Sequence, residues 1–334
     1  HWFVSTPISA YNVSLNAAPY ELLETSYESV DGTTVPVQFF VLPKDVENGR
    51  NMLPEILDHL AFYEENLGPY PFRADKYGVV QTPHLGMEHQ TIIAYGANFN
   101  NGSMTGGQDW GFDALHHHEL AHEWWGNLVT NIEWTDMWLH EGFGSYMQPL
   151  YLEQRQGPEQ YIAALRRSRR GIGNRKAVAP REVLSGKEIY DGHDIYSKGA
   201  WILHTLRYLM GDDAFFRAYR RLAYPEPALE QITDGSHAHF ATTDDFLEIA
   251  EQEADVDLDW FFEVYLRQPR LPRLRTSING DQLELRWDVP RGLEFRLPVE
   301  VLVDGAISVV EMTDGRCSLT AGRNARITID PNSW

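Results

Sequence analysis

The sequence predicts an α+β protein in which a small β-sheet accompanies a mostly helical part and a small antiparallel β-sandwich follows. Runs of β-branched and aromatic residues in the N-terminal part indicate the strands of the sheet. Helical patterns extend over residues 112–268. Beyond residue 271, apolar and polar residues alternate, as is typical of antiparallel strands with one buried face. The order of these patterns along the chain predicts the fold class.

Residues 35–42 form the clearest predicted strand of the N-terminal part, because β-branched and aromatic side chains follow one another there. Residues 77–80 and 91–96 have a similar composition and are expected to be strands too. Between them, residues 51–67 place apolar side chains at helical spacing and end at Gly68-Pro69, which predicts a helix. These elements make up the expected sheet and its first covering helix.

A change of composition near residues 268–274 separates the helical part from the β-sandwich. Residues 197–210, which Gly211 follows, show the helical pattern with its stop signal. After residue 271, leucine, valine and tryptophan alternate with polar residues, and Asn-Gly and Asp-Gly pairs supply hairpin turns. The C-terminal residues are therefore expected to form a sandwich of their own.

The composition of the 334-residue chain argues against two classes of protein. There are 28 lysines and arginines against 48 aspartates and glutamates, a net charge of −20, so the surface lacks the positive charge that a general nucleic-acid binder needs. No run of about 18 apolar residues could span a membrane. Cys317, the single cysteine, has no internal disulfide partner. Because the first residue is His1 and not Met, we expect a processed or excised piece, with a preference for a periplasmic or secreted location. No oligomeric state is predicted.

The segment His118-Glu119-Leu120-Ala121-His122 is the first sign of chemistry. On a helix, two histidines four residues apart project from the same face and can hold one metal ion. Zinc suits imidazole nitrogens and carboxylate oxygens, and a catalytic zinc site keeps three protein ligands and one open position. For this pentapeptide alone, an amphipathic helix with solvated histidines is the alternative.

A second segment, Trp138-Leu139-His140-Glu141-Gly142-Phe143, supplies a candidate third ligand. Eighteen residues separate His122 from Glu141, enough for one helix to end near Gly126-Asn127 and for a second, antiparallel helix to follow. Glu141 lies among tryptophans and other apolar residues, where burial of an unpaired carboxylate would be costly. A metal ion shared with the two histidines removes that cost.

Glu119 is the candidate general base. Its side chain leaves the helix about 100° from that of His118, so it can lie beside a metal-bound water without binding the metal itself. Zinc lowers the pKa of such a water from about 15.7 towards about 7, and a neighbouring carboxylate can take the proton and return it to the leaving amine. A glutamate on the protein surface is the alternative.

These two segments, with the continuation Trp124-Trp125-Gly126-Asn127-Leu128-Val129-Thr130, resemble the gluzincin metallo-aminopeptidases of the aminopeptidase N and leukotriene hydrolase family. The resemblance extends over roughly residues 35–270. It implies a thermolysin-like catalytic domain in residues 36–270 and a β-sandwich domain in residues 271–334. Residues 1–35 are then only a remnant of the N-terminal β domain that family members normally have.

The family resemblance also implies roles for single residues. One Zn²⁺ per chain is expected on His118, His122 and Glu141, with Glu119 as the general base. Tyr196-Ser197-Lys198-Gly199 is similar to the family's Tyr-x-Lys-Gly segment, whose hydroxyl stabilises the tetrahedral intermediate. A phenol stays protonated at neutral pH and can donate to an oxyanion. An aromatic residue that merely caps its helix is the alternative for Tyr196.

The segment Gly86-Met87-Glu88-His89 is similar to the family's Gly-Ala-Met-Glu-Asn motif, whose glutamate binds the α-amino group of the substrate. This implies that Glu88, with help from Glu141, anchors the substrate's amino terminus, and that Gly86 and Met87 border the substrate. A carboxylate pairs well with an ammonium group. The segment departs from the family pattern in His89, where Asn is usual, and in having one small residue fewer before Met87. Without the resemblance, Glu88 would be an ordinary loop carboxylate.

Further polar residues beside these segments could orient the ligands. Helix packing or solvation explains each of them equally well. They are His116, His117, Asp136 and His140.

The predicted function is zinc-dependent hydrolysis of the N-terminal peptide bond of peptides with a free amino terminus. A thermolysin-type endopeptidase, a catalytically silent binding or scaffold relative, and an epoxide-hydrolase side activity stay open as alternatives. Because most of the N-terminal domain is expected to be missing, we expect a more open cleft and an incomplete pocket for the amine.

Overall fold

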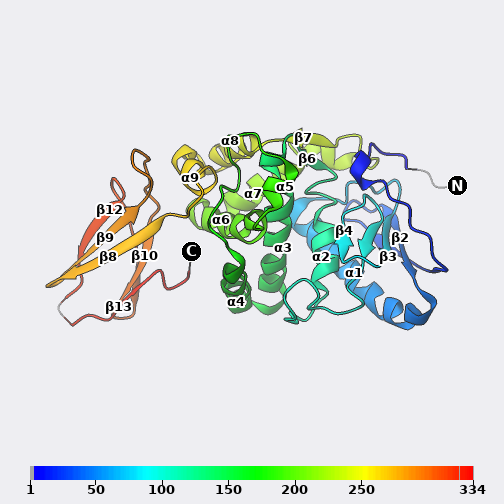
Figure 1. The fold of residues 1–334 in the computed structure, drawn as a ribbon, viewed down its shortest axis with the longest axis horizontal. Coiled ribbons are helices and arrows are strands. Elements are labelled where there is room, and N and C mark those ends of the chain that lie inside the picture. Colours follow the sequence, from blue (N-terminus) through cyan, green and yellow to red (C-terminus); the bar gives the residue numbers. More distant parts are fainter. Residues whose placement is uncertain (1–3, 323, 334) are drawn as a thin grey trace.

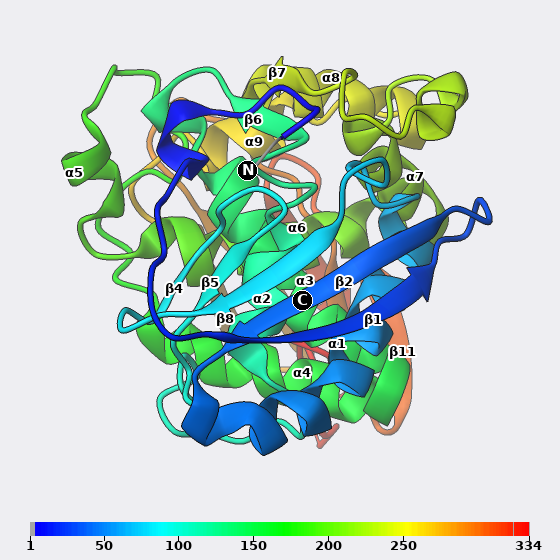
Figure 2. The same ribbon diagram turned by 90° about the vertical axis from the view of Figure 1, so that its right-hand side faces the viewer.

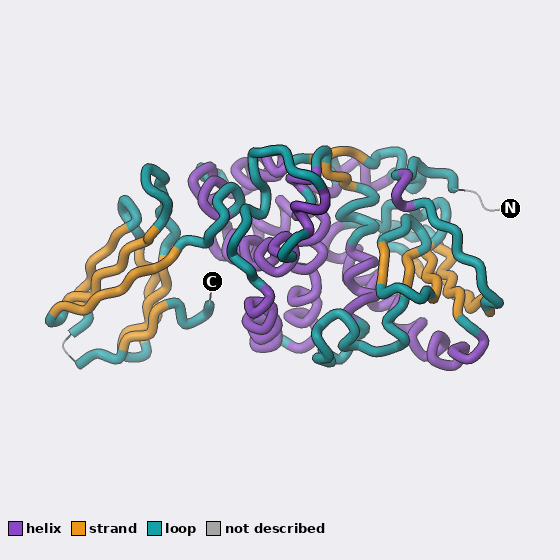
Figure 3. The backbone as a smooth tube through the Cα atoms, viewed as in Figure 1, coloured by secondary structure: helices purple, strands orange, loops and turns teal. Residues whose placement is uncertain are grey.

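The computed structural model describes residues 4–322 and 324–333 of the chain. Most of its helices lie in the middle of an elongated molecule, with a mixed β-sheet at one end and a β-sandwich at the other (Figure 1). Figure 3 shows the same division, because most strands gather at the two ends. This arrangement confirms the predicted α+β class, with its small sheet, helical part and C-terminal sandwich.

The sheet at the N-terminal end consists of β1 (Glu21–Glu28), β2 (Thr34–Val41), β3 (Tyr77–Gln81), β4 (Gly86–Met87) and β5 (Ile93–Tyr95). Its strand order is β1-β2-β3-β5-β4 (Figure 2). β1 and β2 form an antiparallel hairpin, β2, β3 and β5 run parallel, and β4 is an antiparallel edge strand. Alternate side chains of β2 are buried, as expected for a strand with one face towards the core.

Helix α1 (Val46–Leu67) packs against β1 and β2. It begins five residues before the predicted start at residue 51. Its first turns contain weak helix formers, but Gly49 lies against Leu23 and Val41 of the sheet. Tertiary packing therefore extends the helix beyond its local sequence pattern.

The helical part is built around two neighbouring helices, α2 and α3, with α6 packed along α3. Its helices are α2 (Ala114–Ala121), α3 (Trp138–Gln156), α4 (Pro158–Ser168), α5 (Gly186–Tyr190), α6 (Asp194–Met210), α7 (Asp212–Ala223), α8 (Thr243–Ala254) and α9 (Asp259–Tyr265). Short 3-10 turns lie at Ala10–Asn12, Pro43–Asp45, Trp134–Asp136, Arg169–Gly171 and Pro227–Gln231. Two short strands, β6 (Val129–Asn131) and β7 (His239–Ala241), pair in parallel within this part.

Helix α2 ends at Ala121, earlier than the predicted end near Gly126-Asn127. The backbone N–H groups of Glu123 and Trp124 donate to carbonyls three residues back, which tightens the chain into a turn. His122, the C-cap, nevertheless keeps helical dihedral angles (φ −69°, ψ −12°). Its side chain therefore still projects from the same face of the helix as that of His118.

Helix α6 begins at Asp194, three residues before the predicted start at Ser197. The carboxylate of Asp194 accepts hydrogen bonds from the backbone N–H groups of Gly173, Asn174 and Arg175. This contact fixes a distant loop against the start of α6. Tyr196 consequently lies in the first turn of the helix.

The C-terminal sandwich contains β8 (Arg273–Asn279), β9 (Gln282–Asp288), β10 (Val299–Val303), β11 (Ala306–Val310), β12 (Arg316–Thr320) and β13 (Ile327–Ile329). They form two three-stranded antiparallel sheets, with orders β12-β9-β8 and β11-β10-β13. Leu283 and Leu285 of one sheet and Val299 and Val301 of the other are buried in a common core. A chain of aromatic contacts from Trp287 through Phe295 to Trp260 joins the sandwich to α9.

The expected division of the chain between residues 35 and 36 falls within β2, and the division between residues 270 and 271 falls in the link from α9 to β8. How the chain divides into domains stays a prediction. Residues 1–3, in the first expected segment, and residues 323 and 334, in the last, lie outside the described residues. Among the described helices, each is too short or too polar to cross a lipid bilayer.

The buried side chain of His204 contributes to the stability of the fold in a way that depends on pH. His204 is fully buried, donates from Nε2 to the Ser333 carbonyl (2.8 Å) and accepts at Nδ1 from the Tyr161 hydroxyl (2.6 Å). Burial lowers the pKa of His204 to about 4. This pKa is below that of an unfolded histidine, about 6.5. The neutral, hydrogen-bonded His204 side chain therefore stabilises the fold fully above about pH 6.5, and this stabilisation is lost progressively as the pH falls below about 6.5, because the unfolded chain takes up the proton first.

We therefore expect His204→Gln to be less stable than the wild type at about pH 7.5, and the gap to narrow by roughly 1 kcal/mol at about pH 5.5. Urea unfolding at the two pH values measures this difference. His84→Gln, at an exposed position, is the matched control and should leave the pH dependence of the wild type unchanged. A gap that is constant or widens on acidification would contradict the assignment.

Candidate metal centre and active site

Three side chains from two neighbouring helices converge at the centre of the helical part. His118 comes from α2, His122 from the turn that follows it, and Glu141 from the first turn of α3. The Nε2 atoms of the two histidines are 3.2 Å apart, and Glu141 Oε2 lies 3.5 Å from His118 Nε2 and 3.6 Å from His122 Nε2. All three residues are buried. The structure thus brings together the three residues predicted to bind a metal.

The geometry of these three atoms suits a single cation. Ligand atoms at about 2.0–2.2 Å from a tetrahedral zinc ion lie roughly 3.3–3.6 Å from one another, close to the separations found here. His122 Nδ1 donates to the Trp125 carbonyl (2.9 Å), which leaves the lone pair of Nε2 facing the other two groups. Within residues 4–322 and 324–333, the buried Glu141 Oε2 has no hydrogen-bond partner. A bound cation would satisfy it.

The electrostatics of Glu141 favour a charged carboxylate. Burial by itself raises the pKa of Glu141, but the close approach of the His118 and His122 imidazoles brings it down to about 2. Tyr190, on α5, also donates to Glu141 Oε1 (3.1 Å). A carboxylate beside two imidazoles is a donor set that suits zinc.

Close helix packing positions Tyr196 beside the metal ligands. A side chain on Gly142 of α3 would place its Cβ 3.0 Å from the Ile195 carbonyl and 3.2 Å from Gly199 Cα of α6. Glycine at this point therefore lets α3 and α6 approach each other. The Tyr196 phenol consequently interacts with the Glu141 carboxylate, and its ring lies 6.2 Å from that of His118. Burial, together with the charge of Glu141, raises the pKa of Tyr196, so its hydroxyl stays protonated.

Glu119 and Glu88 lie beside the candidate metal ligands. A carboxylate oxygen of each lies within 4.8 Å of the other and of a ring nitrogen of His122. Burial, followed by the charges of Glu88 and Glu141, raises the pKa of Glu119 well above its ordinary value. Its carboxylate lies close enough to the candidate ligand His122 to exchange a proton with a group bound there.

The edge strand β4 holds Gly86 and Met87, both half-buried, directly before Glu88. A Cβ on Gly86 would come within 2.2 Å of Glu119 Oε1, so only glycine leaves room for that carboxylate. The free edge of such a strand can pair with an extended peptide. The residues predicted to border the substrate thus lie where a peptide could run past Glu119.

The N-terminal segment holds the loop that carries Glu88. Gln90 Nε2 donates to Thr6 Oγ1 (2.8 Å), and Asn12 hydrogen-bonds Asn127, whose amide donates to the Glu88 carbonyl (3.2 Å). Tyr11 of the same segment interacts with the Glu88 carboxylate. Figure 2 shows this segment passing over the sheet on the side of β4 and β5. It therefore contributes polar groups to the expected amine pocket.

The sequence model of the peptidase family M1 domain matches residues 55–265 of the chain. The chain belongs to peptidase family M1. The match covers the three candidate ligands, Glu119 and Tyr196, and it confirms the predicted family.

Curated relatives of this M1 chain are aminopeptidases. Human endoplasmic reticulum aminopeptidase 1 is 28% identical over 153 residues, which are 44% of this chain and 16% of the relative. Aminopeptidase N of Streptomyces lividans is 30% identical over 161 residues, covering 44% of this chain and 18% of the relative. The matched part is thus less than a fifth of these relatives.

Solved structures share the fold of the M1 chain. Aminopeptidase A of Legionella pneumophila, in complex with aspartic acid, superposes with a TM-score of 0.67 at 18% identity, over 93% of this chain and 37% of that one. An M1 zinc metallopeptidase of Deinococcus radiodurans, bound to a Tyr-Ser-Ala substrate, gives a TM-score of 0.59 at 22% identity, over 80% of this chain and 56% of that one.

The contacts of the predicted ligand-orienting residues in this M1 chain favour packing roles. Asp136 accepts from the backbone N–H and the hydroxyl of Thr243 and so ties the start of α3 to α8. His140 Nε2 accepts from the backbone N–H of Asn131 (3.0 Å).

His116 and His117, which precede the candidate ligand His118, form hydrogen bonds with tyrosines of the core. His116 Nε2 bonds the Tyr77 hydroxyl (2.9 Å), and His117 Nδ1 bonds the Tyr63 hydroxyl (2.9 Å). Tyr190 and the Trp125 carbonyl, by contrast, contact the ligands directly and escaped sequence reasoning. The contact of Tyr190 depends on how segments 49 positions apart fold together, whereas the Trp125 carbonyl bonds His122 three residues away, within the turn that ends α2.

Removal of the carboxylate ligand should release the metal. We expect Glu141→Ala to retain far less than the roughly one zinc per chain expected of the wild type, because only two ligands remain. Dialysis followed by elemental analysis measures the zinc content, with circular dichroism as a check on folding. Glu133→Ala, at an exposed position shortly before α3, is the control and should keep its zinc. Full zinc retention in Glu141→Ala would show that Glu141 is not a ligand.

Proposed function

We propose that this chain contains the catalytic centre of a zinc aminopeptidase, which hydrolyses the first peptide bond of peptides with a free amino terminus. One observation supports this most strongly: two buried imidazoles and an unpartnered carboxylate oxygen lie 3.2–3.6 Å apart, beside two further carboxylates and a free strand edge. The names of the M1 relatives, which are aminopeptidases, support the same function.

His118, His122 and Glu141 would hold the zinc ion. Bound there, zinc would polarise the scissile carbonyl and make a water molecule acidic enough to ionise near neutral pH. The Deinococcus radiodurans relative is itself described as a zinc metallopeptidase. Two imidazoles and one carboxylate also match the ligand set of known hydrolytic zinc sites.

Three further side chains have separate roles in the proposed hydrolysis. Glu119 accepts the proton of the attacking water and delivers it to the leaving amine, a role that its position beside His122 and Glu88 supports. Tyr196 donates its hydroxyl to the oxygen of the scissile carbonyl as negative charge develops there. Glu88 binds the α-ammonium group of the substrate, so that the first carbonyl meets the metal ligands.

The alternatives differ in what they require of Glu88. A thermolysin-type endopeptidase would use the same metal ligands but would not need a carboxylate for the amino terminus. A silent scaffold relative would be expected to lack a ligand or the base, whereas all of these residues are present and converge. Peptidase activity with an amine anchor therefore accounts for more of the site than either alternative.

The two tyrosines that contact Glu141 provide a matched pair of variants. We expect Tyr196→Phe to lower kcat by about 100-fold or more with zinc content unchanged, because it removes the donor to the oxyanion. Tyr190→Phe loses only its hydrogen bond to a ligand and should weaken zinc binding while kcat at saturating zinc is largely kept. Steady-state kinetics and zinc titration distinguish the two. An unchanged kcat in Tyr196→Phe would exclude the assigned role.

A peptide and its N-acetylated twin separate the aminopeptidase from the endopeptidase. We expect acetylation to lower kcat/KM by about 30-fold or more, because the charge-assisted contact with Glu88 is lost. Glu88→Gln should narrow this ratio. Mass spectrometry of the products shows which bond is cut. Equal cleavage of both peptides would support the endopeptidase.

A further inference from the structure

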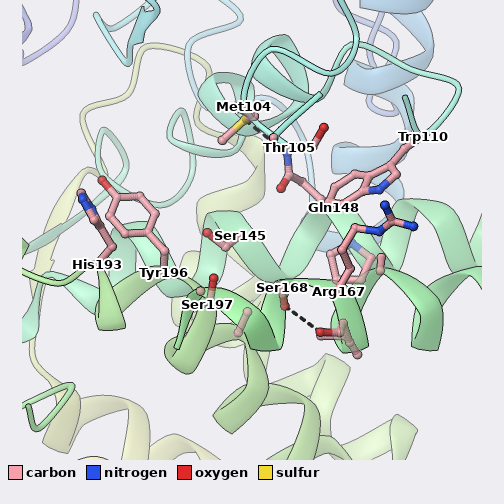
Figure 4. Close-up of a pocket in the computed structure, with 16 residues that line it drawn as sticks. Met104, Thr105, Trp110, Ser145, Gln148, Arg167, Ser168, His193, Tyr196 and Ser197 are labelled. Atoms are coloured by element: carbon pink, nitrogen blue, oxygen red, sulfur yellow. Dashed lines mark hydrogen bonds between the residues drawn. The ribbon is translucent and has the colours of Figure 1, made fainter. Parts of the chain in front are cut away.

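A cavity of about 480 Å³ lies between α3, α4, α6 and the loop that precedes α2. His193 and Tyr196 lie at one end of it, and Trp110 and Arg167 at the other (Figure 4). Ser145 and Ser197 lie between these ends. The volume is within the range of about 300–1,000 Å³ that is common for small-molecule sites.

The cavity adjoins the proposed active site at Tyr196. Tyr196 belongs to both, because its phenol interacts with Glu141 and its side chain lines the cavity. Ser145, another lining residue, is four positions after Glu141 on α3 and so lies on the same helix face. The residues of the amine anchor, by contrast, are not part of the lining: Gly86, Met87 and Glu88 all lie at the strand edge.

A substrate held at its amino terminus by Glu88 places its first carbonyl at the metal ligands and must direct the rest of its chain elsewhere. The cavity beyond Tyr196 is a route for that part. Its walls offer apolar surface from Leu165, Pro149 and Ala200 and hydroxyl groups from the serines. Such a mixture suits peptide side chains and peptide backbone.

Arg167 is the arginine of this lining, in a chain with a net charge of −20. Its Nη1 donates to Gln108 Oε1 (2.5 Å), which holds the guanidinium against the loop before α2. Its other N–H groups remain available, since a guanidinium has five donors. In the described part of the chain Arg167 forms no ion pair with a carboxylate. The adjacent Asp109 instead accepts from the Gly111 N–H and from Asn101.

We propose that this cavity binds the leaving part of a short peptide and that Arg167 binds its terminal carboxylate, which makes peptides of a few residues the preferred substrates. This inference rests on the proposed aminopeptidase function. Hydrolysis adds water across the first peptide bond: the carbonyl carbon gains the hydroxyl, the C–N bond breaks, and the new amine takes the proton. The new amine and the terminal carboxylate of the released peptide would then both lie on the side of the cavity.

The test compares a tripeptide with its C-terminal carboxamide, and both with an aminoacyl-anilide, which has no carboxylate. The first residue is the one that a panel of anilides shows to be preferred. For the wild type we expect KM to be about tenfold or more lower for the free acid than for the amide, because a charge-assisted contact is lost in the amide. Arg167→Gln should abolish this difference, and Arg167→Glu should reverse it.

Turnover of the anilide reports separately on folding and on the proposed function. It should be unchanged in Arg167→Gln, and Arg170→Gln, an exposed arginine outside the cavity lining, should retain the full preference for the acid. Equal KM values for the free acid and the amide in the wild type would overturn the inference, and so would a preference for the acid that survives Arg167→Gln. In either case, turnover of the anilide would still support the proposed aminopeptidase. Absence of turnover on all three substrates would instead overturn the proposed function, and the inference with it.

Discussion

The architecture depends on a local electrostatic constraint: two imidazole nitrogens and a carboxylate oxygen are held 3.2–3.6 Å apart inside the protein. Away from water, an ionised carboxylate oxygen without a partner destabilises the fold. A cation between the three atoms converts this cost into binding energy. α2, its C-cap and the first turn of α3 bring these groups together.

The glycines near the site are part of the same constraint. Gly142 allows α3 to approach α6, and Gly86 gives the Glu119 carboxylate its space beside the edge strand. A methyl group on Gly86 would displace the Glu119 carboxylate, and one on Gly142 would press against the Ile195 carbonyl and Gly199 of α6. The small residues of the motifs are therefore explained by packing as much as by chemistry.

The cleft has two chemically different sides. Glu88, Glu119 and the N-terminal segment present oxygen atoms near the edge strand, where an ammonium group would bind. Beyond Tyr196, a cavity with apolar walls leads to the cationic Arg167. A peptide has its positive charge at one end and its negative charge at the other, so this polarity matches one direction of binding. The N-terminal segment contacts the loop that carries Glu88, the side chain proposed to bind the substrate's amine.

The sequence predicted the parts of the site that depend on local spacing. His118 and His122 are four residues apart, and Glu141 follows at a distance that an antiparallel helix pair spans, so these three residues could be found without coordinates. The order of sheet, helices and sandwich was also predictable, because each has its own hydrophobic period.

Contacts between distant segments could not be predicted in this way. Tyr190 reaches Glu141 across 49 positions of sequence, and β6 pairs with β7, more than a hundred residues later. The early start of α1 depends on packing against the sheet, and the early end of α2 on a tightened turn after Ala121. The cavity that ends at Arg167 is bounded by three helices and a loop, so no local sequence pattern marks this exposed arginine.

Anomalous diffraction at the zinc absorption edge, from crystals of the protein purified with zinc, is the most direct test of the metal centre. A single strong peak within bonding distance of His118 Nε2, His122 Nε2 and Glu141 Oε2 is the predicted result. A map without a peak there, or with zinc only at surface carboxylates while these three side chains turn away from one another, would contradict the account.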